Sequence, residues 1–296
     1  MGGKKNMYKK ILALMMALAV MFAFTGCISS NNEVTVKADG TADVYVDFSI
    51  DKTKMESVTY DVMLEMAKAA ADENATEADI IKEAQDNTKD FMEGFEEGLL
   101  EDGQFKLEKI DGIEYYTMKV DAKGASIKDA REVFKTYDSK AWLSAKAFNV
   151  DLSNMLSGSD TEEIENAASD VAFDMSFKAT LPYEIVKTNG KLSADKKTVE
   201  WSYTSVKDDS RLYAFAADKT KPVVTGVKNG KSYKSKVTVK VSDKDSGVKS
   251  AVIKNTKTGK TYAKFTGSKK VTKKGKYSVT VTDNMGNKKT VKFTVK

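Results

Sequence analysis

The sequence contains no histidine and only one cysteine among its 296 residues. Without histidine, the chain lacks the base of Ser-His-Asp and Cys-His catalysis and the commonest zinc ligand. The single thiol, Cys27, leaves no partner for an internal disulfide. Carboxylate-pair catalysis stays open because Asp and Glu total 43, but no spacing singles out a pair. Composition therefore favours a protein that is not an enzyme and holds no cofactor and no metal.

Long apolar runs are also scarce, and the one present spans 11–24. It follows a leader with four lysines and no acidic residue. Its 14 residues are too few for a helix that crosses a bilayer, which needs about 20 apolar residues. The run instead has the length and flanks of a signal-peptide core. Met7 is an alternative start to Met1, because residues 7–10 alone supply a basic leader.

The residues that end this run, Phe24-Thr25-Gly26-Cys27, resemble the bacterial lipobox. In that family a diacylglycerol is attached to the cysteine thiol and a peptidase cuts just before it. The resemblance implies a lipoprotein signal peptide over 1–26 and lipidation of Cys27, although Phe24 stands where leucine is usual. An ordinary secretory signal with an incidental Cys27 is the alternative. Two acyl chains anchor a protein stably. We therefore expect a lipidated tether over 27–33 and an extracellular protein on the outer face of the cytoplasmic membrane.

Charge divides the rest of the chain in two. Residues 28–217 contain 22 Lys and Arg against 39 Asp and Glu, a net charge of −17. Residues 218–296 contain 22 Lys, no Arg, four Asp and no Glu, a net charge of +18. The sign changes within 217–222, a polar stretch that holds Pro222, one of only two prolines. This predicts an acidic domain over 34–217 and a basic domain over 218–296.

Apolar periodicity in the acidic domain switches between strand and helix. Alternating side chains predict strands, and apolar residues three and four apart predict helices, with Thr76 and Ser126 as helix caps. The expected strands are 34–37, 44–50, 104–110, 113–121 and 171–181; the expected helices are 54–71, 76–99 and 127–137, the last extended by 141–148; a loop is expected over 158–166. The pattern predicts an α+β fold, an antiparallel sheet with a helical insertion.

Two stretches of this domain resemble a known family. The segment LPYEIVKTNGKLSADKKTVEWSY, residues 181–203, is similar to the closing part of LppM-type lipoprotein domains, in which a strand ending in Leu-Pro leads through Asn-Gly to a strand bearing Trp. The opening from Val34 to Gly40, close behind the cysteine, is similar as well. The resemblance implies an α+β lipoprotein domain without an established catalytic site.

The basic domain predicts an all-β fold. Valine alternates with polar residues over 237–242, 277–282 and 291–296, and glycine-containing turns separate these runs. Such spacing over 79 residues is typical of a β-sandwich of about seven strands. The ending, with Gly275-Lys276-Tyr277 and then residues 281–287 (VTDNMGN), resembles bacterial Ig-like modules of surface proteins. The resemblance implies a spacer or adhesive module and fixes no ligand.

Two groups of residues are candidate sites. Asp243-Lys244-Asp245-Ser246-Gly247 begins like some calcium loops, but acidic ligands are missing downstream until Asp283. The stretch is therefore interpreted as a β-turn rather than a metal site. Trp142 and Trp201 either stack against sugars or pack in the core, and core packing is favoured.

The lysines of the basic domain are the remaining feature. Strand lysines discourage edge-to-edge pairing, but ordinary solvated faces mix both signs of charge. The excess is interpreted either as a solvated face or as a surface for an anionic cell-wall polymer; nucleic acid is not an expected partner. We expect a non-enzymatic surface lipoprotein of a Gram-positive-type bacterium. The alternatives are a glycan- or small-molecule-binding receptor with a pocket in the first domain, or a carboxylate hydrolase.

Overall fold

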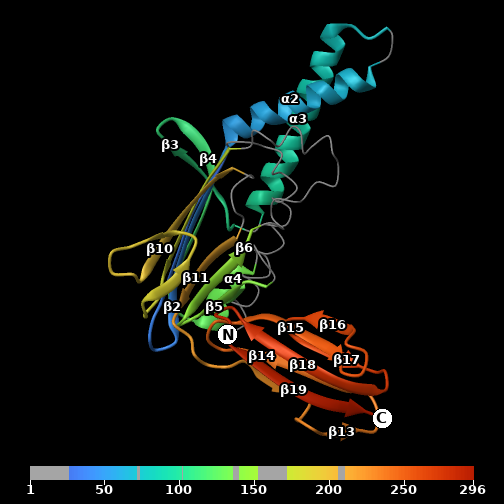
Figure 1. Ribbon diagram of the computed structural model, residues 1–296. Coiled ribbons are helices and arrows are strands. Elements are labelled where there is room, and N and C mark those ends of the chain that lie inside the picture. The colour runs from blue at the N-terminus through green and yellow to red at the C-terminus, as the bar shows by residue number, and fades with distance from the viewer. Residues whose placement is uncertain (1–26, 72–73, 102, 136–139, 153–171, 206–210) are drawn as a thin grey trace.

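The computed structural model describes residues 27–71, 74–101, 103–135, 140–152, 172–205 and 211–296. Figure 1 shows a body of strands, with a helical hairpin beyond one end and a second group of strands beyond the other. The expected signal peptide over 1–26 and the expected loop over 158–166 lie outside the described residues.

The N-terminal region, residues 27–217, is built on two sheets. Its seven-stranded sheet has the order β3-β4-β2-β1-β7-β10-β9, and its four-stranded sheet has the order β5-β6-β11-β8. The strands are β1 (Ile28–Val36), β2 (Thr41–Asp51), β3 (Lys106–Ile110), β4 (Ile113–Ser126), β5 (Trp142–Ser144), β6 (Ala147–Asp151), β7 (Ala172–Thr180), β8 (Ile185–Thr188), β9 (Lys191–Leu192), β10 (Thr198–Ser205) and β11 (Arg211–Ala216). The helices are α2 (Lys52–Ala70), α3 (Glu77–Leu100) and α4 (Ile127–Phe134).

Helix starts follow the capping residues in the sequence. Thr76 and Asp79 form a capping box at the start of α3, in which each side chain accepts from the other residue's backbone N–H. Ser126 caps α4 by accepting from the Asp129 N–H at 3.2 Å. These local hydrogen bonds satisfy N–H groups that have no partner within the helix. The expected helix starts at these two residues are confirmed.

Residues 27–33 were expected to form a tether, but most of them belong to a strand, because β1 begins at Ile28. Every second side chain of this strand is buried, including the polar Ser30 and Asn32. Asn32 Nδ2 donates to Ser30 Oγ at 2.6 Å and to the Ser176 carbonyl at 3.2 Å. Hydrogen bonds of this kind remove the cost of burying polar groups, so a stretch that looks like a linker becomes a central strand.

Two further expectations about the N-terminal region are corrected. The large sheet is not purely antiparallel, because β1 pairs with β7 in parallel, with Val34 opposite Ala179. Residues 141–148 do not extend a helix but form the hairpin of β5 and β6. Pairing of β6 with β11 completes its backbone hydrogen bonds and buries Phe148 and Val150, which outweighs the weak helical pattern.

Helices α2 and α3 pack on each other and project from the sheet (Figure 1). In α2 the buried side chains are Met55, Thr59 and Ala67, four and eight positions apart. Val62 and Met66, which continue the helical spacing from Met55, are exposed, since α3 covers the adjacent stripe instead. Of these two methionines, only Met55 therefore belongs to the core.

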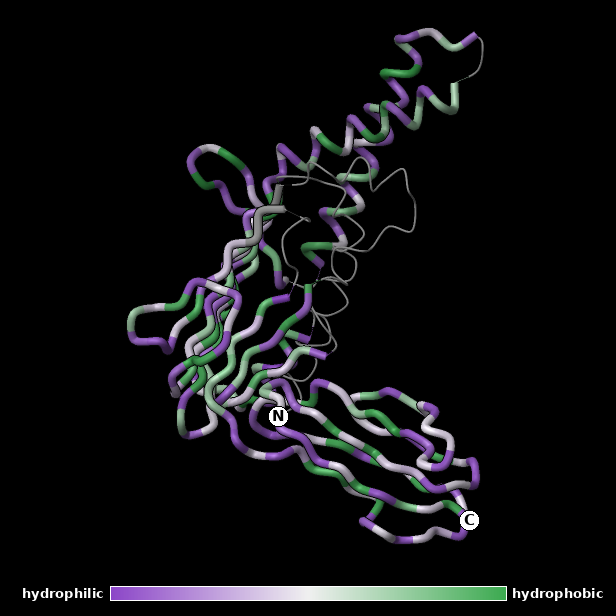
Figure 2. The backbone as a smooth tube through the Cα atoms, in the orientation of Figure 1, coloured by the Kyte–Doolittle hydropathy of each residue, from purple (hydrophilic) through white to green (hydrophobic). Residues whose placement is uncertain are grey.

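The C-terminal region, residues 218–296, has its own core. A three-stranded sheet with the order β12-β14-β17 and a five-stranded sheet with the order β13-β19-β18-β15-β16 enclose a cluster of buried side chains that includes Val239, Ile253 and Phe293. In Figure 2 the tube of this region alternates between apolar and polar colours along its strands. The strands are β12 (Val223–Thr225), β13 (Ser232–Tyr233), β14 (Val237–Ser242), β15 (Val248–Asn255), β16 (Thr261–Phe265), β17 (Ser268–Val271), β18 (Gly275–Asp283) and β19 (Lys288–Val295).

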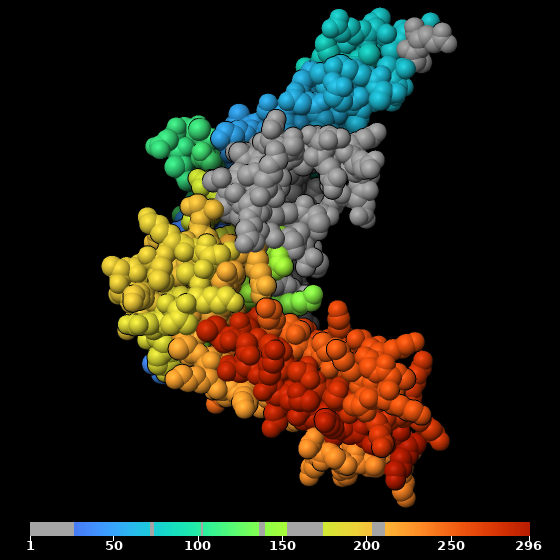
Figure 3. Space-filling model, in the orientation of Figure 1, coloured from blue at the N-terminus to red at the C-terminus, as the bar shows by residue number. Residues whose placement is uncertain are grey.

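The expected boundary at 217/218 lies between the two clusters of buried side chains. The N-terminal cluster reaches Ala214, and the C-terminal cluster begins at Val227. The space-filling view shows the C-terminal region, orange to red, as a lobe that joins the rest at one end (Figure 3). Within the described residues, no helix is long and apolar enough to cross a membrane.

Candidate functional site at the junction of the two regions

The loop after β14 joins the two regions through Asp245. The Asp245 carbonyl accepts hydrogen bonds from Trp142 Nε1, at 3.2 Å, and from Ser144 Oγ. Its carboxylate accepts from Lys146 Nζ at 3.0 Å and from Thr220 Oγ1 at 2.9 Å. Burial alone would raise the pKa of Asp245, but these two hydrogen bonds outweigh it and lower the pKa. The polar boundary thus forms a defined contact rather than a free linker.

Close packing supports the same contact. The Arg131 guanidinium carbon lies 4.0 Å from the centroid of the Trp142 ring. A Cβ placed on Gly247 would lie 3.0 Å from that ring, and Gly247 has a φ of +80°. Only glycine adopts this backbone conformation without strain while leaving room for the indole. Trp142 is therefore half-buried between the two regions, with its ring packed against Arg131 and Gly247.

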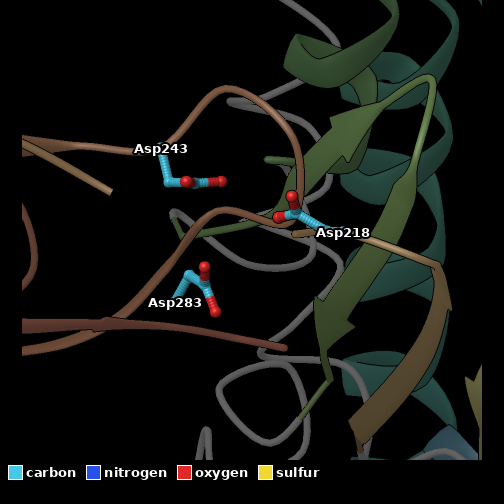
Figure 4. Close-up of side chains that lie close together, drawn as sticks. All are labelled: Asp218, Asp243 and Asp283. Carbon is cyan, nitrogen blue, oxygen red and sulfur yellow. The ribbon is translucent and has the colours of Figure 1, made fainter. Parts of the chain in front are cut away.

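Beside this contact, three aspartates from three separated segments come together. Asp218 follows β11 where the chain crosses between regions, Asp243 follows β14, and Asp283 ends β18. Their exposed fractions are 6%, 4% and 0%, and one carboxylate oxygen from each lies within 4.8 Å of the other two. The three carboxylates point toward one another in Figure 4.

Backbone N–H groups hold each of these carboxylates in place. Asp243 Oδ1 accepts from the N–H groups of Asp245 and Gly247, at 3.1 and 3.0 Å. Asp283 Oδ1 accepts from those of Met285 and Asn287, at 2.9 and 2.8 Å.

The third aspartate is held in the same way and links the loops to the crossing chain. Asp218 Oδ1 accepts from the Thr220 N–H at 2.8 Å, and its Oδ2 accepts from the Ser246 N–H at 3.2 Å. Turns after the strands therefore aim the three carboxylates at a shared space.

The electrostatics of this cluster are unusual for so basic a region. Burial raises the pKa of Asp243, and the neighbouring charges of Asp218 and Asp283 add to that rise. Among the described residues, no lysine or arginine nitrogen lies within 4.0 Å of any of the three carboxylates. Chemically, the arrangement is a set of hard oxygen ligands of the kind that bind Ca²⁺ or Mg²⁺.

A cleft opens next to the cluster, also at the junction. Its volume is about 430 Å³. The N-terminal region contributes Trp142, Asn149 and Arg211, and the C-terminal region contributes Asp243 and Lys249. The receptor alternative expected a pocket within the first domain, and a hollow of about 660 Å³ does lie there, between α2 and α3, lined by Tyr60, Thr88 and Met92. The cleft beside the aspartates lies instead between the two regions.

The other residues singled out in the sequence lie apart from the junction. Cys27 is buried at the start of the first strand, and its carbonyl accepts from the Asp51 N–H at 2.7 Å. Burial raises the pKa of its thiol to about 11. Trp201 is 7% exposed, packs 5.4 Å from Phe148 between ring centroids and donates to Asn189 Oδ1. It therefore belongs to the core, as the alternating strand predicts.

The lysines of the C-terminal region are all exposed. None of the 22 lysines of residues 218–296 is buried or half-buried. In the part of the chain that the structure describes, none of them lies within 4.0 Å of a carboxylate, since each ion pair there uses a lysine of the N-terminal region. The positive charge of this lobe therefore faces solvent without neutralising partners.

Sequence reasoning missed the aspartate cluster, although one signal was available. The C-terminal region has only four acidic residues, and each of them ends a strand or lies in the turn or crossing beside one. Three of the four form the cluster, and the fourth, Asp245, bonds to Lys146. Asp283 was not counted as a ligand beside Asp243 because it lies far along the chain. Antiparallel strands, however, bring distant loops to one end of a sheet.

Comparison with known proteins gives partial matches. No protein-family profile matches the sequence. Over 80 residues, or 27% of this chain, the sequence is 46% identical to an outer cell wall protein of Brevibacillus brevis. The match covers 8% of that relative, so the chain spans less than a tenth of its length.

One solved structure is also similar. The folded domain of the LppM protein of Mycobacterium tuberculosis, determined by NMR, aligns with 66% of this chain and 93% of its own length at 9% identity. The TM-score of 0.32 is too low to carry an argument about fold or function. The chain is thus similar over a limited stretch to a protein of a bacterial cell wall.

Proposed function

We propose that this chain is a non-enzymatic, lipid-anchored protein of the cell envelope whose basic C-terminal region binds an anionic polymer of the cell wall. The observation that carries the proposal is the set of 22 exposed lysines that have no carboxylate partner in the described part of the chain. A surface of one sign attracts a polyanion over distances of several ångströms. The similarity to an outer cell wall protein supports an envelope location.

The arrangement of the two regions supports the same proposal. The strand that begins after Cys27 pairs with the end of β2, with Ile28 opposite Ile50, and α2 begins at the next turn of the chain. Helices α2 and α3 extend beyond that end of the sheet, and the C-terminal region lies beyond the other end (Figure 1). This arrangement supports an orientation in which the basic region lies on the side of the molecule away from a lipid on Cys27.

Buried carboxylates also favour a role other than catalysis. Asp218, Asp243 and Asp283 are each at most 6% exposed, which leaves little room for a substrate to reach them. The chain has no histidine to act as a general base.

The proposal predicts binding that weakens steeply with salt. The full-length protein in detergent should sediment with purified walls that carry teichoic acid. Raising the salt from about 0.05 M to about 0.5 M should weaken that binding by about tenfold or more, because exposed charges are screened beyond ~8 Å at physiological salt. Sedimentation of the protein with walls across the salt series measures the effect.

Matched variants locate the charge responsible. Replacing Lys288, Lys289 and Lys292 of β19 with Gln should weaken wall binding, because the three lysine side chains are exposed and lie close together on one strand. Replacing Lys106, Lys109 and Lys128 of the N-terminal region with Gln changes the net charge equally and should leave binding intact. Equal loss in both variants, or no binding at low salt, contradicts the proposal.

A receptor for a small ligand is the second candidate. The cleft of about 430 Å³ favours it, because polar and charged groups from both regions, including Asn149, Arg211 and Lys249, line one space. Retention of a wall-derived sugar or peptide by the full-length protein, lost on Arg211→Ala, would support this candidate over polymer binding.

A further inference from the structure

We propose that Asp218, Asp243 and Asp283 bind one divalent cation, with Ca²⁺ preferred over Mg²⁺, at the junction between the two regions. The site is assigned from two kinds of observation. One is the convergence of three carboxylates, and the other is a set of buried polar atoms that the protein leaves without hydrogen bonds.

The unpartnered atoms are Asp283 Oδ2 and Ser246 Oγ. Both residues are fully buried. The Asp283 carboxylate points at the other two (Figure 4), and the backbone N–H of Ser246 donates to Asp218 Oδ2. A buried carboxylate oxygen without a donor is costly, and native proteins leave few such groups. An ion among the three carboxylates supplies the missing partner.

Charge distribution points to an ion rather than to a side chain. The C-terminal region has 22 lysines, yet none lies within 4.0 Å of these three aspartates among the described residues. Asp245, the remaining acidic residue of the region, does pair with a lysine, Lys146. The cluster is therefore the one acidic feature of a basic lobe that a protein cation does not neutralise, within the part of the chain that the structure describes.

The kind and number of the protein ligands favour Ca²⁺ over Mg²⁺. Ca²⁺ lies about 2.3–2.6 Å from its oxygen ligands, so two oxygens on opposite sides of it are about 5 Å apart. Around Mg²⁺, at about 2.0–2.1 Å, that separation is about 4 Å. Oxygens that lie within 4.8 Å of one another can surround either ion. Three carboxylates held on turns by backbone hydrogen bonds favour Ca²⁺, because Mg²⁺ is usually bound by one or two carboxylates and keeps several waters. Water would complete the coordination.

Calcium binding to the full-length protein in detergent, stripped with EDTA, tests the proposal. Equilibrium dialysis should find about one Ca²⁺ per chain, and Mg²⁺ should compete at least about tenfold more weakly. Ligands that bind only the folded state stabilise it, so saturating Ca²⁺ should raise the unfolding temperature by about 5 °C or more.

Variants separate a metal site from a structural cluster. Asp283→Asn keeps Oδ1 as the acceptor for Met285 and Asn287 but removes the charge and one ligand oxygen. It should lose calcium binding by about tenfold or more while unfolding at the native temperature, or above it, in EDTA. Asp243→Asn should behave in the same way, which keeps the test open if one variant does not fold. Asp245→Asn, a neutralisation in the same loop outside the cluster, should retain calcium binding.

Three outcomes overturn the proposal. They are no Ca²⁺ bound by the native chain at about 5 mM, calcium affinity unchanged in both cluster variants, or equal affinity for Mg²⁺. The lysine variants should lose wall binding and retain calcium binding. The two proposals are therefore tested independently, because each assay can fail without the other.

Discussion

Replacing Cys27 with Ala should release the protein from the membrane almost completely. Cys27 is the only thiol in the chain, and the described residues include no helix that could span a bilayer. Each buried methylene of an acyl chain contributes about 0.8 kcal/mol to anchoring, so losing the two proposed acyl chains should remove the main attachment. Fractionation followed by detergent-free washing measures the retained protein, which should fall by about tenfold or more.

The buried position of Cys27 adds an expectation about timing. The residue is 4% exposed, and its carbonyl is bonded to the Asp51 N–H. The proposed acylation should therefore precede folding of β1, so a refolded, unlipidated chain should not be modified by added membranes. Ser29→Ala changes a neighbouring small side chain on the same strand and serves as the control. Full retention of Cys27→Ala on washed membranes contradicts lipid anchoring.

Phe148→Ala should lower the free energy of unfolding of the N-terminal region by about 3–5 kcal/mol. Phe148 is 1% exposed and lies where three elements meet. Its ring centroid is 5.2 Å from that of Phe134 on α4, at an interplanar angle of 89°, and 5.4 Å from that of Trp201 on β10. Truncation leaves a cavity between the two sheets and removes both aromatic contacts.

Urea unfolding followed by tryptophan fluorescence measures this loss. Tyr183→Ala is a matched control, because Tyr183 is an aromatic residue of the same region but is 47% exposed. It should change stability by less than about 0.5 kcal/mol. A loss below about 1.5 kcal/mol for Phe148→Ala would mean that the two sheets do not share one core at this residue.

Local patterns were sufficient for much of the secondary structure. Alternation identified β14, β18 and β19, because one face of each strand is buried against the same core. The capping box at Thr76 and the N-cap at Ser126 fixed two helix starts, since a cap depends only on residues within one turn.

Pattern reasoning failed where a distant partner decided the outcome. The polar run after Ile28 is a strand because its hairpin with β2 continues back to Ile28 and because β7, far along the chain, supplies a parallel neighbour and an acceptor for Asn32. Residues 141–148 are a hairpin because β11 pairs with β6. No window of the local sequence contains either partner.

The sequence by itself determined the division of charge, because lysines and carboxylates can be counted without a fold. It also indicated that the 22 lysines of a β-rich segment lie mostly on the surface. Only the tertiary structure decided where the few acids of that segment lie. Antiparallel strands carry Asp243 and Asp283 to one end of the C-terminal region, and the crossing chain adds Asp218. Residues distant in sequence thereby share one buried space. The repulsion among their carboxylates arises from this closeness in the fold and cannot be read from the local sequence.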